Sequence, residues 1–83
     1  MSGKVYKVTA PLAGTFYFAP SPEDPPFVEV GQKVKTGDVV CIVESMKVFT
    51  EIRAERSGTV VNVLVMDEDP VRKEQALIEI EVA

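Results

Sequence analysis

The chain contains the same short pattern twice, and this internal repeat limits the folds that its 83 residues can adopt. A shift of 37 positions superposes a stretch from the middle of the chain on its C-terminal part. The matched residues are Val34-Lys35 with Val71-Arg72, Val40 with Leu77, Cys41 with Ile78, Val43 with Ile80, and Glu44 with Glu81. Each copy is too short to bury its apolar face alone, so the two copies are expected to pack on each other.

A second match fixes where the copies differ in length. Gly14-Thr15 corresponds to Gly58-Thr59 at a shift of 44 positions, so the first copy carries seven extra residues near positions 19–25. Two copies of one small β unit predict an all-β domain with pseudo-twofold symmetry over residues 1–83. The natural packing is two small sheets, face to face.

Apolar, β-branched segments between glycine-containing turns give the expected strands. The glycines are Gly14, Gly31, Gly37 and Gly58, all expected at turns where a positive φ excludes other residues. The expected strands span residues 4–9, 14–18, 27–30, 39–45, 48–53, 58–65 and 76–82.

A single lysine, Lys47, interrupts the apolar stretch in the middle of the chain. Residues 39–45 and 48–53 on its two sides favour a hairpin with Met46 and Lys47 at the tip, exposed to a visiting partner. The same window also fits the apolar spacing of a helix. We favour the hairpin, because β-branched side chains lose χ1 freedom in a helix.

Composition excludes several classes of function. The chain has no histidine, hence no Ser-His or Cys-His nucleophile pair, and we expect it to be non-catalytic on its own. Its net charge of −4 argues against a nucleic-acid partner. Cys41 has no cysteine partner and is expected to be a small buried hydrophobe. Asp67-Glu68-Asp69 is expected to be a solvated turn, so no metal site is predicted.

Neither a membrane span nor the apolar core of a signal peptide is evident in the sequence, because no apolar run approaches the roughly 18 residues that a span needs. We therefore expect a soluble, intracellular protein without a membrane partner.

The extra residues of the first copy have an unusual composition. They hold four of the six prolines of the chain, which lack the N–H group needed for a regular ladder. We expect a stiff, protruding loop rather than a strand. It comprises Ala19, Pro20, Ser21, Pro22, Glu23, Asp24, Pro25 and Pro26.

Several segments together resemble one known family. Glu44-Ser45-Met46-Lys47-Val48 is similar to its Glu-Ala-Met-Lys-Met attachment motif, with Ser45 and Val48 as the departures. Residues 10–17, Ala-Pro-Leu-Ala-Gly-Thr-Phe-Tyr, are similar to its Ser-Pro-Met-Val-Gly-Thr-Phe-Tyr stretch, and residues 27–34, 37–38 and 57–60 also match. From about Val8 onward the chain resembles the biotinyl domains of the biotin carboxyl carrier proteins of multi-subunit acetyl-CoA carboxylases.

The resemblance implies a flattened β-barrel of two four-stranded antiparallel sheets, with biotin attached covalently to Lys47 on a hairpin tip. It also implies that a biotin protein ligase reads Glu44, Ser45, Met46 and Val48 around that lysine. The proline-rich loop, about residues 19–26, falls where carriers of acetyl-CoA carboxylase have a "thumb" beside the biotin, which most other biotinyl domains lack.

By the same resemblance the domain carries a carboxyl group from a biotin carboxylase subunit to a carboxyltransferase subunit, for malonyl-CoA formation in fatty acid synthesis. The expected domain is monomeric when isolated, and cytoplasmic, or plastid in a plant. The alternatives are the biotinyl domain of another biotin-dependent carboxylase or decarboxylase, a lipoyl carrier domain, and a barrel-sandwich domain with no cofactor. A lipoyl domain typically has Asp directly before the lysine, where this chain has Met46.

Overall fold

The structure is a computed structural model and describes residues 3–83. Within them the chain forms two four-stranded sheets, with strand orders β1-β8-β6-β3 and β5-β4-β2-β7, in which all neighbours are antiparallel. The strands are β1 (Val5–Thr9), β2 (Gly14–Tyr17), β3 (Lys33–Val34), β4 (Val39–Ser45), β5 (Val48–Arg53), β6 (Gly58–Val63), β7 (Pro70–Val71) and β8 (Ala76–Val82). The predicted all-β fold is confirmed.

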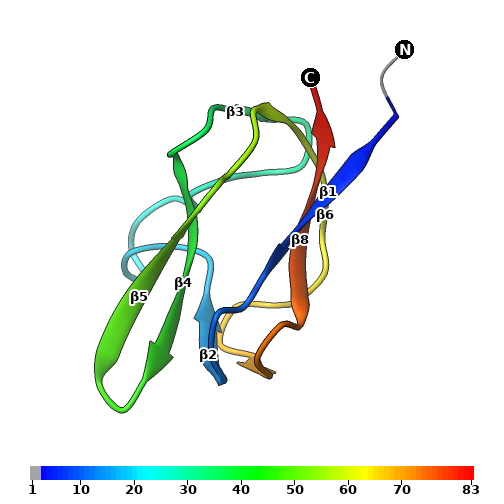
Figure 1. Ribbon diagram of the computed structural model, residues 1–83. Helices are drawn as coiled ribbons and strands as arrows, with labels where there is room; N and C mark the ends of the chain where they lie inside the picture. The colour runs from blue at the N-terminus through cyan, green and yellow to red at the C-terminus, as the bar shows by residue number, and fades with distance from the viewer. Residues whose placement is uncertain (1–2) are drawn as a thin grey trace.

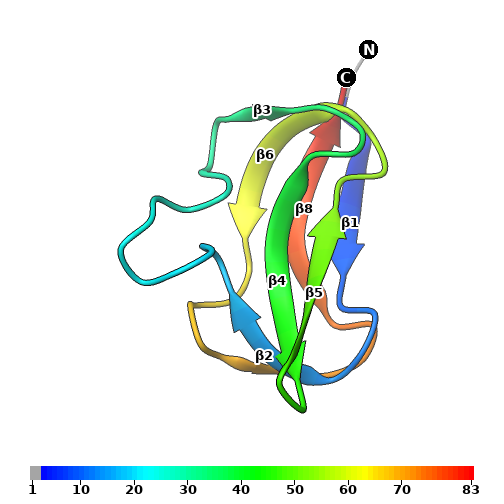
Figure 2. The ribbon, with the colours of Figure 1, turned by 90° about the vertical axis from the view of Figure 1, so that its left-hand side faces the viewer.

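The two sheets pack face to face and leave the chain ends and the β4–β5 hairpin at opposite ends of the molecule (Figure 1, Figure 2). Phe16, Val43 and Ile80 are fully buried between them, and the buried side chains of residues 3–83 are all apolar. Cys41 belongs to this core, as predicted, and burial raises the pKa of its thiol to about 12. The core therefore derives its stability from apolar burial.

The stretch around Lys47 is a hairpin and not a helix. β4 and β5 pair from Val39↔Arg53 to Ser45↔Val48, with one irregularity between Val39 and Cys41. The β-branched residues that argued against a helix lie on these two strands. The prediction of a hairpin tip at residues 46–47 is confirmed.

The two copies of the sequence repeat make the same hydrogen bonds. The Lys35 N–H donates to Asp38 Oδ2 and the Arg72 N–H to Gln75 Oε1, both at 2.9 Å and 37 positions apart. A further equivalent pair joins the Glu29 N–H to Gln32 Oε1 at 3.1 Å and the Met66 N–H to Asp69 Oδ2 at 2.8 Å. The pseudo-twofold symmetry is thus present in the backbone turns as well as in the sequence.

The predicted strand at residues 27–30 is wrong. Val28 is buried there, but the Phe27 N–H bonds to the Phe18 carbonyl at 2.8 Å and the Glu29 N–H bonds to a glutamine side chain, so no ladder forms. The prediction also missed β3 and β7, which are two residues long and therefore show no alternation. They are equivalent in the repeat, and β6 ends at Val63 rather than at residue 65.

The four glycines fall into two groups. Gly31 and Gly37 have positive φ angles of 95° and 97°, as predicted. Gly14 and Gly58 do not, and the turn explanation is wrong for them: they begin β2 and β6. A Cβ atom on Gly14 would collide with the carbonyl of Glu44 on β4, and one on Gly58 with the carbonyl of Glu81 on β8. These two positions require glycine because two backbones approach closely.

The proline-rich segment forms a loop that projects from the body (Figure 2). The hydrogen bond between Phe18 and Phe27 closes its base, and the Ser21 hydroxyl donates to Asp24 Oδ2 at 2.8 Å within it. Its first residue, Ala19, is buried, whereas Glu23 is exposed. We call residues 19–26 the thumb loop.

The described part of the chain contains no helix with the length and apolar character needed to cross a membrane.

Candidate functional site

Met46 and Lys47 form a two-residue connection between β4 and β5, and both are exposed to solvent. Their φ angles are 54° and 65°, and the residues on either side, Ser45 and Val48, face each other as the last pair of the ladder. Positive φ at both central positions is the mark of a type I′ turn, which matches the twist of the flanking strands. The turn therefore presents the Lys47 side chain away from the body of the domain.

This turn carries backbone strain. Type I′ turns favour Asn-Gly, and a residue with a Cβ atom in the left-handed region costs roughly 1–2 kcal/mol. Met46 is 93% exposed, so its side chain recovers no burial energy in return. Strain without a packing reason is typical of functional sites.

Replacing Met46 by Asn and Lys47 by Gly together should stabilise the domain. The pair removes one strained residue and supplies one that tolerates positive φ, so we expect the free energy of unfolding to rise by about 1–2 kcal/mol. Thermal denaturation measures this as a midpoint increase of roughly 4–8 °C per kcal/mol. Met46→Leu keeps the strain and should leave the midpoint unchanged. A double variant no more stable than Met46→Leu would contradict the strain argument.

The other residues of the attachment motif surround the turn. Glu44 and Ser45 end β4, and Val48, which is 62% exposed, begins β5. Glu44 lies on the outer face of the sheet, where its Oε1 accepts a hydrogen bond of 3.0 Å from the Tyr17 hydroxyl. This hydrogen bond raises the pKa of the Tyr17 phenol above its ordinary value. All the predicted residues of the motif thus lie together at the hairpin end of the molecule.

Tyr17 is a site residue that the sequence did not reveal. It lies on β2, next to β4 in the sheet, and its ring is 6.2 Å from the ring of Phe49 on β5. Glu68 and Asp67 also raise the pKa of Tyr17, after Glu44 and burial. The contact between β2 and the hairpin depends on strand order, which a single sequence does not give.

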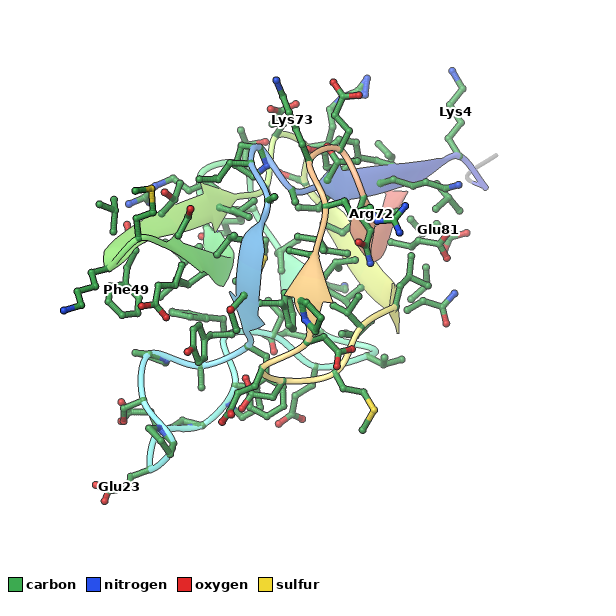
Figure 3. The ribbon with its side chains drawn as sticks, turned by 90° about the horizontal axis from the view of Figure 1, so that it is seen from below. Lys4, Glu23, Phe49, Arg72, Lys73 and Glu81 are labelled. Atoms are coloured by element: carbon green, nitrogen blue, oxygen red, sulfur yellow. The ribbon has the colours of Figure 1, made fainter. Side chains whose placement is uncertain are left out.

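The thumb loop extends from the strand that carries Tyr17. Figure 3 shows Glu23 of this loop and Phe49 of the hairpin at neighbouring projections on one side of the molecule. The Phe18 N–H at the start of the loop bonds to Asp67 Oδ1 at 3.1 Å. The loop therefore begins at a position fixed by the turn before β7.

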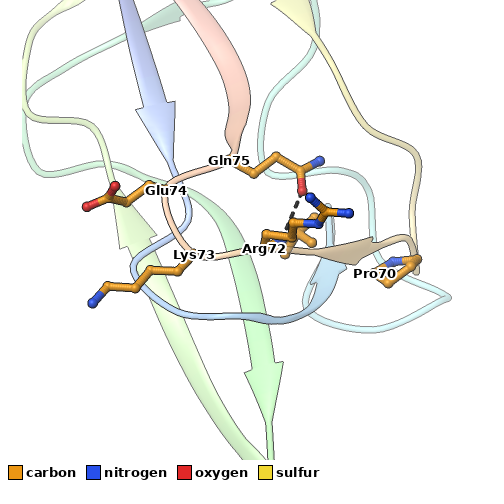
Figure 4. Close-up of a pocket in the computed structure, with 6 residues that line it drawn as sticks. Pro70, Arg72, Lys73, Glu74 and Gln75 are labelled. Carbon is orange, nitrogen blue, oxygen red and sulfur yellow. Dashed lines mark hydrogen bonds between the residues drawn. The ribbon is translucent and has the colours of Figure 1, made fainter.

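A surface hollow lies in the turn after β7, lined by residues 70–75 (Figure 4). Arg72, Lys73 and Glu74 are exposed there, and the Arg72 N–H bonds to Gln75. The equivalent turn of the other copy has the same hydrogen bond, between Lys35 and Asp38. The hollow is thus a feature of the repeat's turn and gives Lys73 no special surroundings.

Comparison with known proteins agrees with this geometry. The family model Biotin_lipoyl, described as "Biotin-requiring enzyme", matches residues 6–82. The chain is 52% identical over 73 residues to the biotin carboxyl carrier protein of acetyl-CoA carboxylase of Pseudomonas aeruginosa, covering 88% of this chain and 47% of that protein. It is 55% identical over 62 residues to the chloroplastic biotin carboxyl carrier protein 2 of Arabidopsis thaliana, covering 75% and 24%.

A solved structure shares the fold. The crystal structure of the Kluyveromyces lactis urea carboxylase is similar with a TM-score of 0.77 and 26% identity, covering 94% of this chain and 6% of that one. The chain thus spans less than half the length of the relatives named here. Because the family model covers almost the whole chain, and the hairpin lysine lies within the match, the chain belongs to the Biotin_lipoyl family.

Proposed function

We propose that the chain is the biotin carrier domain of an acetyl-CoA carboxylase, with biotin joined to Lys47. The observation that carries the proposal is the exposed, strained turn at Met46-Lys47 in a domain of this family. The names of relatives about 50% identical to the chain support biotin and this enzyme. The thumb loop supports it too, because the resemblance places such a loop in carriers of acetyl-CoA carboxylase.

The chain's own contribution is presentation of one amine. The Lys47 Nζ would hold biotin through an amide to the biotin carboxyl group, which the ligase would first activate with ATP so that its oxygen leaves with the nucleotide, and the lysine would lose its positive charge. When bound, biotin supplies a ureido ring that accepts and releases a carboxyl group. Glu44, Ser45, Met46 and Val48 surround the amine and are the proposed recognition residues for a biotin protein ligase.

The proposed partners beyond the ligase are a biotin carboxylase subunit and a carboxyltransferase subunit, which hold the active sites. The domain itself is a non-catalytic carrier, consistent with the carrier proteins among its relatives. Tethering the cofactor to a mobile domain raises its local concentration at each active site to the order of mM, without a tight interface. The proposed location is the cytoplasm, or the plastid in a plant.

The thumb loop is proposed to restrict the motion of the attached biotin. The test replaces residues 19–26 by one valine, because the second copy of the repeat joins Asn62 to Leu64, the equivalents of Phe18 and Phe27, through Val63 alone. NMR relaxation of isotope-labelled biotin should show faster motion in this variant. An unchanged thermal midpoint serves as the control for folding, and equal biotin mobility in the two proteins would contradict a role for the loop.

The function is tested by intact-mass measurement and peptide mapping after incubation with a biotin ligase, biotin and ATP. We expect one adduct, on Lys47. A folded domain without an adduct would overturn the proposal. Incubation with a lipoyl ligase in parallel tests the lipoyl alternative, which the methionine before the lysine disfavours.

A second candidate is a carrier of another biotin-dependent carboxylase, favoured by the structural similarity to urea carboxylase. Transfer of labelled bicarbonate to an acceptor distinguishes the two. With ATP and the biotin carboxylase and carboxyltransferase subunits of an acetyl-CoA carboxylase present, the biotinylated domain should support conversion of acetyl-CoA into labelled malonyl-CoA. Failure there, with labelling by subunits that carboxylate a different acceptor, would favour the second candidate.

A further inference from the structure

Three side chains form a compact group on the outer face of the sheet that carries Lys47. Glu44 faces Phe49 across the β4–β5 ladder, and the Tyr17 hydroxyl donates to Glu44 Oε1. The Tyr17 and Phe49 rings are tilted by 42° with centroids 6.2 Å apart, a distance at which aromatic pairs attract. Because one carboxylate oxygen is held, Oε2 of Glu44 has a defined orientation.

The internal repeat shows that the fold does not require this group. At the other end of the molecule, Glu81 is the equivalent of Glu44 and faces Val5, the equivalent of Phe49. The equivalent of Tyr17 is Val61. Valine side chains have no O–H group to donate, so these two positions cannot orient Glu81. At the end of the molecule that has no hairpin lysine, the two positions are valines. At the end that carries Lys47, they are the tyrosine that donates the hydrogen bond and the phenylalanine that packs on it.

The exposure of the group also points to a partner rather than to packing. Phe49 is 59% exposed, although burial of its ring would stabilise the fold. Met46, in the turn beyond Phe49, is also largely exposed, whereas the exposed Val48 points to the opposite face of the strand. The group therefore offers an oriented carboxylate acceptor beside an apolar surface, which fits a protein partner with an N–H donor and an apolar contact.

We propose that Tyr17 is a positioning residue for the modification of Lys47: it holds the Glu44 carboxylate, braced by Phe49, in the orientation that the ligase reads. The inference rests on the proposed biotinylation of Lys47. Orienting a long side chain before binding avoids the entropy cost of ordering it in the complex. Loss of this orientation should weaken binding of the domain without changing the chemical step.

The test is the steady-state kinetics of a biotin ligase with the domain as the varied substrate. Tyr17→Phe removes the hydroxyl and keeps the ring, and we expect KM to rise about threefold to tenfold with kcat unchanged. Tyr6→Phe, the same chemical change on β1 of the other sheet, is the matched control and should leave both constants unchanged. Thermal denaturation should show that both variants remain folded at the temperature of the assay.

A double variant separates action through Glu44 from direct contact. In a Glu44→Ala background, Tyr17→Phe should have no further effect on KM. A KM for Tyr17→Phe equal to that of wild type would overturn the inference, as would equal losses in the Tyr17 and Tyr6 variants or full additivity in the double variant. A wild-type domain that is not biotinylated at all would instead overturn the proposed function, and the inference with it.

Discussion

Replacing Gly58 by alanine should destabilise the domain by about 3 kcal/mol, at the upper end of the range for overpacking. The added Cβ would collide with the carbonyl of Glu81 and lie 2.8 Å from Ile80 Cγ2, a fully buried side chain. Ile80 and Glu81 both belong to β8, which pairs with β6, so neither the side chain nor the carbonyl can move without disturbing the sheet. We expect the midpoint of thermal unfolding to fall by roughly 12–24 °C.

Gly14→Ala should cost about as much, since its Cβ would collide with the carbonyl of Glu44 and lie 2.9 Å from Val43 Cγ1. Gly37 is the contrasting position: its Cβ would meet no atom within 4 Å, but its φ is positive. Gly37→Ala should cost only about 1–2 kcal/mol. Asparagine, which tolerates positive φ, should be milder than alanine at Gly37 and worse at Gly58. A Gly37→Ala variant less stable than Gly58→Ala would contradict the close-approach explanation.

These glycines show what the sequence reveals and what it hides. The repeat identifies Gly14 and Gly58 as equivalent, but the reason for glycine lies on the facing strands, which are distant in the sequence. Residues 27–30 illustrate a different error, since three apolar residues in four resemble a strand even where a backbone N–H bonds to a side chain. Val28 is buried and Val30 is 63% exposed, so the apolar run shows neither which side chains face the core nor where the backbone finds its partners.

Part of the candidate site could likewise be predicted from the sequence, and part could not. Lys47 and its neighbours are contiguous in the chain, so the β-branched strands and the lone lysine identify the hairpin tip from sequence. Tyr17 and Glu44 are 27 residues apart and meet only because β2 pairs with β4. The repeat predicts two sheets, but it gives neither the order of the strands in each sheet nor the register in which they pair. Contacts across strands therefore require the structure.

Lys47→Arg should abolish the biotin adduct completely while leaving the fold intact. Arginine keeps the positive charge, but its delocalised guanidinium is not the primary amine that an amide with biotin requires. Because the turn is exposed, the free energy of unfolding should change by no more than about 0.5 kcal/mol. Intact-mass measurement after incubation with the ligase reads the adduct, and thermal denaturation reads the fold.

Two further variants test whether the position of the lysine in the turn matters as well as its amine. Lys73→Arg changes an exposed lysine in the turn after β7 and should leave the adduct on Lys47 unchanged. A double variant with Lys47→Arg and Val48→Lys moves the amine by one residue, from the positive-φ turn into β5, where alternation of side chains sends it in another direction. It should remain unmodified. Modification of the displaced lysine at the wild-type rate would mean that the ligase recognises the local sequence alone, and that the strained turn has no part in presenting the amine.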